Sequence, residues 1–325
     1  MELNGKLLLL NPDISTLWNH RRRVFIDTKQ ESTTTMDTLN TILTQELKLT
    51  EGAIAKNTKS YYAWFHRKWC IQNLTSLPSQ TTASSPDPAT TASTESIPST
   101  SSPVTTVFNP QNEILLCNKL LDLDERNFHC WSYRRWFTET YAITIDVELQ
   151  FTLDRIQKNF SNYSAWHQRS YLLQKKYIHT LIPLSILTEE LELLRQAMFT
   201  EPDDQSPWFY HRWIIYDVCK HITLTATTPY DEIYQLLMID CQHLRSLKEI
   251  EALSKWPLIA LIHTSQLYYQ TLHKHSLQTI FEQLSTTIHI TNGILSLTEI
   301  QSYLTNLETM DELHKDYYEY LRTNV

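Results

Sequence analysis

One tryptophan-centred segment occurs five times along this chain of 325 residues. The copies are NPDISTLWNHRR, NTKSYYAWFHRKW, DERNFHCWSYRRW, NFSNYSAWHQRSY and EPDDQSPWFYHRW, centred on Trp18, Trp64, Trp131, Trp166 and Trp208. A fainter sixth copy, LSKWPLIAL, surrounds Trp256. Self-similarity at such a period is typical of repeat proteins, in which each unit buries its face against its neighbours.

The spacing of the tryptophans has one exception, which a low-complexity segment explains. The steps are 46, 67, 35, 42 and 48 residues. The longest step contains residues 75–107, which are rich in Ser, Thr, Pro and Ala and nearly lack large apolar side chains. Such a segment cannot offset its ordering entropy by burial, so we predict that it is disordered. Without its 33 residues the step falls to 34.

Within each unit the pattern predicts two helices joined by a polar turn. The segments NEILLCNKLLDLD and DVELQFTLDRIQKN carry apolar residues at helical spacing and predict the first helix of their units. The second helix should begin four residues before each tryptophan. Good N-caps stand at that position in four units, namely Ser60, Asn127, Asn162 and Asp204. The first unit has Ile14 there, with Asp13 or Ser15 beside it as substitutes.

Glycine is scarce, with three residues in the whole chain, against an average usage of roughly 7%. Hairpin turns and phosphate-cradling loops require glycine, so sheets and P-loops are disfavoured. We therefore predict an all-α fold, a right-handed α-α superhelix in which helix hairpins stack as a tetratricopeptide-like crescent. We expect a single helical-repeat domain over residues 1–325, interrupted by the insert at 75–107.

The repeated tryptophans and arginines are predicted to be structural. An aromatic residue three before the tryptophan and an arginine three after it share its helix face. In the fifth unit the arginine is shifted by one position. We expect one arginine of each Arg-Arg run to pair with a carboxylate of the adjoining unit and the other to be solvated. The signature comprises Trp18, Trp64, Trp131, Trp166, Trp208, Arg67, Arg134, Arg169 and Arg212.

Composition narrows the function. The net charge of −8 argues against a general binder of nucleic acid or anionic membrane. The five cysteines form no CxxC pair, which favours a reduced, cytoplasmic chain with buried thiols. No HExxH or CxxC motif is present, so we predict no metal site in this chain. No cysteine stands in a catalytic local signature, so we predict no cysteine nucleophile either. The N-terminal segment is too short for a signal peptide, and no stretch approaches a membrane span.

One position breaks the repeat in an informative way. The residue five before each tryptophan is Asp13, Lys59, Arg126, Ser161 or Asp203, so only the second and third units are basic there. In a hairpin solenoid these positions lie along one edge, next to helix N-termini, which attract anions. We predict that Lys59 and Arg126 form a phosphate or diphosphate site, to which Tyr61 adds a hydroxyl. The alternative is two solvated surface cations.

These repeats resemble the NYxxWxxR-type repeat of the alpha subunits of protein prenyltransferases. The segments TKSYYAWFHRKW, DERNFHCWSYRRW, NFSNYSAWHQR and DDQSPWFYHRW, with the tail ETMDELHKDYYEYLR, are most similar to the Rab geranylgeranyltransferase (type II) branch. The branch of farnesyltransferase and type I geranylgeranyltransferase remains an alternative, as does a non-catalytic helical-repeat interaction scaffold. The insert at 75–107 is not part of the family pattern.

The resemblance implies an enzyme that is active only as a heterodimer with a beta subunit, which carries the zinc ion. Such an enzyme transfers a geranylgeranyl group from geranylgeranyl diphosphate to C-terminal cysteines of Rab GTPases, presented by a Rab escort protein. The motif Lys59-Ser60-Tyr61 matches the family's diphosphate-facing lysine, and Arg126 matches the second diphosphate-facing residue. Their implied role is to stabilise charge on the leaving group.

Overall fold

The computed structural model describes residues 1–74, 108–219, 230–274 and 294–323, and they form two compact units, Met1–Ile143 and Thr144–Val325. Unit 1 contains α1 (Glu2–Leu10), α2 (Ser15–Gln30), α3 (Met36–Lys56), α4 (Tyr61–Asn73), α5 (Pro110–Leu123) and α6 (Phe128–Thr140). Unit 2 contains α7 (Ile145–Lys158), α8 (Tyr163–Lys176), α9 (Leu184–Thr200), α10 (Gln205–Arg212), the π-helix η1 (Trp213–Cys219), α12 (Tyr230–Ile250), α13 (Trp256–Lys274), α15 (Leu297–Met310), the 3₁₀-helix η2 (Glu312–His314) and α16 (Lys315–Thr323). The described residues contain no strand, so the predicted all-α fold is confirmed.

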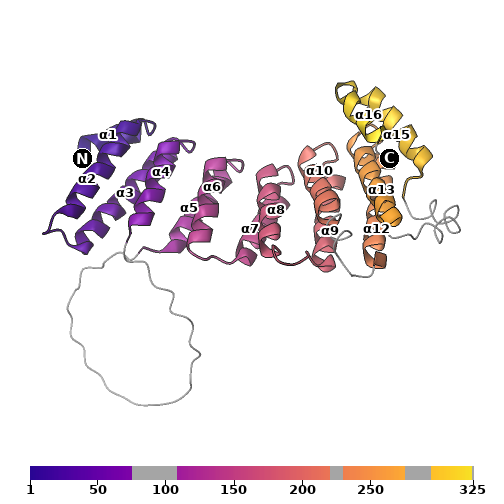
Figure 1. Cartoon of the computed structure of the whole chain (residues 1–325). Helices are drawn as coiled ribbons and strands as arrows, with labels where there is room; N and C mark the ends of the chain where they lie inside the picture. The colour runs from indigo at the N-terminus through magenta and orange to yellow at the C-terminus, as the bar shows by residue number, and fades with distance from the viewer. Residues whose placement is uncertain (75–107, 220–229, 275–293, 324–325) are drawn as a thin grey trace, which may run out of the picture. The chain divides into compact units, whose positions relative to one another are not determined.

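The helices of each unit follow one another as antiparallel pairs (Figure 1). Helices α3 and α4, then α5 and α6, make the hairpins of unit 1, while α7 with α8, α9 with α10 and α12 with α13 make those of unit 2. The signature tryptophans of the second to fifth repeats lie on the second helix of a pair, as predicted. The predicted disorder of 75–107 concerns residues outside those described, and the single domain over 1–325 stays a prediction.

The predicted caps start the second helices. The Ser60 hydroxyl accepts from the Ala63 amide, the Asn127 side chain from two amides, and Asn162 and Asp204 from one amide each. Each cap satisfies backbone donors that the helix start leaves without intrahelical partners. In the first repeat Ile14 gives no side-chain cap, and Asp13 instead accepts a hydrogen bond from Asn57.

Every signature tryptophan is buried and makes the same hydrogen bond. Its Nε1 donates to the carbonyl oxygen six residues earlier, at 2.8–2.9 Å, in all five repeats. The acceptors are Pro12, Thr58, Glu125, Phe160 and Pro202. The bond ties the second helix to the turn before it, so the tryptophan fixes the hairpin as well as filling the core.

Buried carboxylates join neighbouring repeats within each unit. In unit 1 the Arg67 Nε atom donates to Glu113 on the next hairpin at 2.8 Å, and the Tyr133 hydroxyl donates to the same carboxylate at 2.7 Å. In unit 2, the carboxylate of Glu190 accepts a hydrogen bond from the Arg169 Nε atom at 2.8 Å and from the Tyr210 hydroxyl at 2.7 Å. Arg67 and Arg169 therefore pair with a carboxylate of the adjoining repeat. Arg21 of the first arginine run pairs with Glu46 of the next repeat, as predicted for that run.

The structure departs from the prediction at two arginines, Arg212 and Arg22. Three residues after Trp208 stands His211, which is buried and lies 2.9 Å from Asp240, whereas the side chain of Arg212 is exposed and lies over the Tyr317 ring. Arg134, by contrast, is buried, as predicted for a structural arginine, and donates to Asn118 at 2.8 Å. The second arginine of the first run, Arg22, is only partly exposed, so it is not simply solvated.

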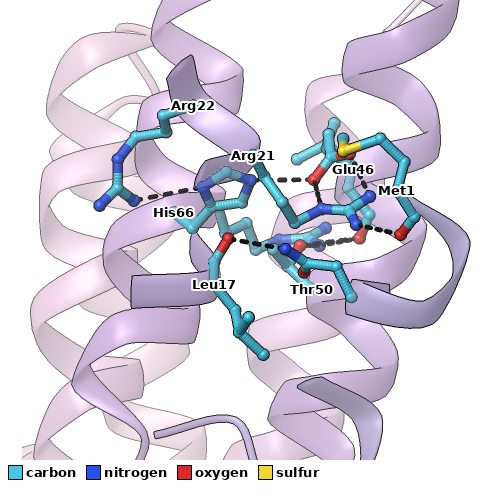
Figure 2. Close-up of polar contacts among 10 residues, drawn as sticks. Met1, Leu17, Arg21, Arg22, Glu46, Thr50 and His66 are labelled. Atoms are coloured by element: carbon cyan, nitrogen blue, oxygen red, sulfur yellow. Dashed lines mark hydrogen bonds and ion pairs between the residues drawn. The ribbon is translucent and has the colours of Figure 1, made fainter. Parts of the chain in front are cut away.

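Arg22 belongs to a polar network around the buried imidazole of His66 (Figure 2). Arg22 lies 3.2 Å from the Nδ1 atom of His66, and Glu46, which also binds Arg21, lies 3.0 Å from its Nε2 atom. A guanidinium can only donate hydrogen bonds, so Nδ1 must accept, and Nε2 carries the hydrogen and donates a hydrogen bond to Glu46. His66 is therefore neutral in the folded protein, and burial lowers its pKa.

The stability of the first unit is expected to fall as the pH drops below about 6.5, because the unfolded chain then protonates His66 more readily than the folded one. The fourth repeat has buried Gln168 at the matching position, so His66→Gln keeps a hydrogen-bonding side chain and removes the titration. Urea midpoints of both forms at pH 7.5 and pH 5.5 measure this. Equal losses of stability in the two forms would show that other groups carry the dependence.

Candidate anion site

The candidate site lies on the turns that precede α4 and α6 in unit 1. In four of the repeats, the turn before the second helix is closed in the same way. The side chain seven residues before the tryptophan accepts a hydrogen bond from the backbone amide two residues later. The pairs are Asn11 with Asp13, Asn57 with Lys59, Asp124 with Arg126 and Asn159 with Ser161, at 2.9–3.2 Å. These short asparagine and aspartate turns present the residue before each cap at the turn edge.

Asp124 contacts both predicted residues, Lys59 through its ammonium and Arg126 through its backbone amide. Its Oδ2 atom lies 3.4 Å from the Nζ of Lys59, and its Oδ1 atom accepts the backbone amide of Arg126. The side chain of Lys59 is 69% exposed and that of Asp124 is 34% exposed, while Arg126 is also exposed. The turns carrying Lys59 and Arg126 are thus neighbours, and both residues face solvent.

Aromatic rings border this edge. The ring of Tyr61 packs edge-on against His129, with 4.2 Å between centroids, and lies 6.0 Å from Phe128. Tyr61 and Phe128 are exposed, so the aromatic residue three before the tryptophan does not join the buried face. Burial and the nearby charge of Lys59 lower the pKa of His129. His129 therefore adds no positive charge of its own to the site.

The arrangement suits an anion better than a metal or a nucleophilic reaction. Lys59 supplies an exposed ammonium, and the dipoles of two thirteen-residue helices add positive potential at the same edge. The caps already occupy the amides of Ala63, His129 and Cys130, so the side chains must supply most of the anion's hydrogen bonds.

Other chemistries find little support in the described part of the chain. No group of three His, Cys, Asp or Glu side chains there could hold a metal ion. All five cysteines are buried, and burial raises the pKa of Cys219 to about 12, which disfavours a thiolate. No helix among the described residues is long and apolar enough to cross a membrane.

Sequence reasoning missed two groups that the structure reveals. Asp124 was not identified as the partner of Lys59, and the buried carboxylates of the first helices were not singled out. A signal for the second group exists, because a glutamate stands 18 residues before the tryptophan in four consecutive repeats. These glutamates are Glu46, Glu113, Glu148 and Glu190, and all are buried.

Comparison with known proteins agrees with this architecture. The protein prenyltransferase alpha subunit repeat matches residues 43–74, 110–141, 145–176 and 187–217. The solved Candida albicans protein geranylgeranyltransferase-I complexed with GGPP contains a similar chain, with a TM-score of 0.61 over 98% of this chain and 82% of that one, at 17% identity. The last comparison shows a shared helical-repeat fold.

Curated relatives define the family. The chain is 31% identical over 325 residues to the geranylgeranyl transferase type-2 subunit alpha of Dictyostelium discoideum, covering 99% of this chain and 83% of that protein. It is 38% identical over 221 residues to the Bos taurus subunit of that name, covering 66% of this chain and 33% of that protein. The match thus spans about a third of the length of the mammalian relatives. The chain belongs to the protein prenyltransferase alpha subunit family.

Proposed function

We propose that this chain is the alpha subunit of a heterodimeric Rab geranylgeranyltransferase. In this proposal it works with a beta subunit and transfers a geranylgeranyl group from geranylgeranyl diphosphate to C-terminal cysteines of Rab GTPases presented by an escort protein. The observation that carries the proposal is the meeting of the Lys59 and Arg126 turns at Asp124. The type-2 names of the relatives support this branch over the farnesyltransferase and type I branch.

The role proposed for Lys59 and Arg126 is electrostatic. When the bond between the isoprenoid carbon and the diphosphate oxygen breaks, negative charge grows on the diphosphate. Cations placed at that position stabilise the transition state more than the ground state, which lowers the barrier. Tyr61, which flanks Lys59 and is exposed, is proposed to add a hydroxyl donor to the same leaving group.

Zinc chemistry is assigned to the beta subunit in this proposal. The described residues of this chain offer no group of three side chains that fits a metal ion. The contribution of this chain is therefore limited to binding and stabilising the diphosphate and to presenting its repeats to the partner. No step through zinc is assigned to its residues.

Replacing both Lys59 and Arg126 with alanine is expected to reduce turnover roughly 100-fold, because the growing charge loses both cations. The chain is co-expressed with a geranylgeranyl transferase type-2 beta subunit, and prenyl transfer to a Rab–escort complex is measured. The matched control, Arg23→Ala with Lys29→Ala, removes one arginine and one lysine from exposed positions on α2 and should leave turnover unchanged.

Three outcomes would count against the proposal. Unchanged turnover in an intact heterodimer carrying both alanines would remove the site. Failure to form an active complex with a type-2 beta subunit, combined with activity alongside a farnesyltransferase beta subunit, would move the chain to the other branch. A chain that binds peptides and gains no activity with any beta subunit would be a scaffold.

A further inference from the structure

The carboxylate of Asp124 does more than close a turn. Asparagine closes the corresponding turns of the neighbouring repeats, where Asn57 and Asn159 accept backbone amides at 3.1 and 2.9 Å, as Asp124 does at 3.2 Å. The hydrogen bond needs only a side-chain oxygen, which asparagine and aspartate share. The negative charge at position 124 is therefore not required by the turn.

The same position also reaches back to the preceding repeat. Asn57 donates to Asp13 at 3.0 Å, and Glu201, at the equivalent position of the fifth repeat, accepts the hydroxyl of Ser161 at 2.7 Å. At Asp124 this contact becomes an ion pair with Lys59, 3.4 Å long. The residue that faces Lys59 is thus an anion. Of these three contacts between repeats, only the one at Asp124 joins opposite charges.

We infer that Asp124 is a resident counter-anion, which holds the Lys59 ammonium in the empty site and is displaced from it when a diphosphate binds. This inference rests on the proposed function of Lys59. A diphosphate that takes the ammonium must replace the carboxylate and then lie beside it, which opposes binding by like-charge repulsion. Asp124 therefore positions Lys59 before binding and weakens the hold on the diphosphate product, which favours its release.

The test is the affinity of the heterodimer for inorganic pyrophosphate, measured by calorimetry at fixed ionic strength. Asp124→Asn keeps the turn oxygen and removes the charge. It should tighten binding by about 2- to 5-fold, the range of an exposed ion pair. Glu201→Gln neutralises a carboxylate at the equivalent position that faces a hydroxyl, so its affinity should equal that of the wild type. If Asp124 had only a structural role, Asp124→Asn would not raise the affinity for pyrophosphate.

Lys59→Ala separates failure of this inference from failure of the proposed function. If wild-type heterodimer binds no pyrophosphate, or if Lys59→Ala leaves binding unchanged, the anion site itself is wrong. If Lys59→Ala weakens binding while Asp124→Asn binds as the wild type does or more weakly, the role given to Asp124 is overturned and the site stands. Tighter binding by both Asp124→Asn and Glu201→Gln would reveal a general charge effect and would also overturn it.

Discussion

Glu113→Ala is expected to destabilise the first unit by about 3–5 kcal/mol, because it leaves a buried guanidinium without its carboxylate. Glu113, Arg67 and Tyr133 are all buried, and the carboxylate receives both other side chains at 2.7–2.8 Å. Burial alone would lower the pKa of Arg67, but Glu113 and Tyr133 hold it above its ordinary value. A guanidinium does not deprotonate in proteins, so Arg67 stays charged after the substitution although Glu113 no longer raises its pKa. Urea unfolding of the full chain, followed by circular dichroism, measures the loss.

Two further variants test whether the loss of stability in Glu113→Ala comes from the unpaired buried charge. Glu31→Ala removes an exposed carboxylate and should change stability by no more than about 0.5 kcal/mol. The double substitution Arg67→Met with Glu113→Leu removes both charges at once and should be less damaging than Glu113→Ala alone, since no unpaired charge stays buried. A Glu113→Ala chain that unfolds at the wild-type urea concentration would show that water reaches Arg67.

The elements that depend on local sequence properties could be predicted, because the same local pattern recurs in each repeat. Helix periodicity and cap residues are local properties, so the second helices and their N-caps at Ser60, Asn127, Asn162 and Asp204 could be predicted. The spacing of Lys59 and Arg126 also predicted that their turns are neighbours, because equivalent positions of stacked hairpins meet at one edge.

The sequence did not predict which side chains of other hairpins contact a given residue. Helical spacing places Tyr61, Trp64 and Arg67 along one face, yet Tyr61 is 65% exposed while the other two are buried. Only the next hairpin decides where that face is covered. The same limit applies to Asp124, which looks like an ordinary turn residue until the preceding repeat brings Lys59 against it.

The fifth repeat shows a second limit of pattern matching. The sequence suggested that its arginine had moved to position 212, since a basic residue was expected near Trp208. The buried position is instead occupied by His211, whose partner Asp240 takes the place that glutamate has in earlier repeats. The pairing of a basic side chain with a carboxylate is kept while both residue types change, so the pair is recognisable only from the structure.

In the first two repeats, the turn carbonyl that accepts a hydrogen bond from the signature tryptophan also accepts one from the cap residue of the next repeat. The Pro12 carbonyl accepts from Trp18 at 2.8 Å and from the Ser60 hydroxyl at 3.2 Å. The Thr58 carbonyl accepts from Trp64 at 2.9 Å and from the side-chain amide of Asn127 at 3.1 Å. One oxygen with two lone pairs therefore connects a tryptophan to the cap of the following hairpin.

Trp166→Ala is accordingly expected to destabilise the second unit by about 3–5 kcal/mol, the range for removing a buried aromatic side chain. Trp166 is 1% exposed, donates to the Phe160 carbonyl at 2.8 Å and lies 4.8 Å from the Tyr210 ring of the next repeat. Trp166→Phe keeps most of the volume and loses the hydrogen bond, so it should cost only about 1–2 kcal/mol.

The control is Tyr163→Ala, three residues earlier on the same helix, where the ring is exposed. Its loss should stay within about 1 kcal/mol, because little buried surface is removed. Urea unfolding and hydrogen exchange of α8 amides report the effects on the second unit. Equal losses for Trp166→Ala and Tyr163→Ala would contradict a repeat held together by its tryptophans, since one ring is buried against the next hairpin and the other faces solvent.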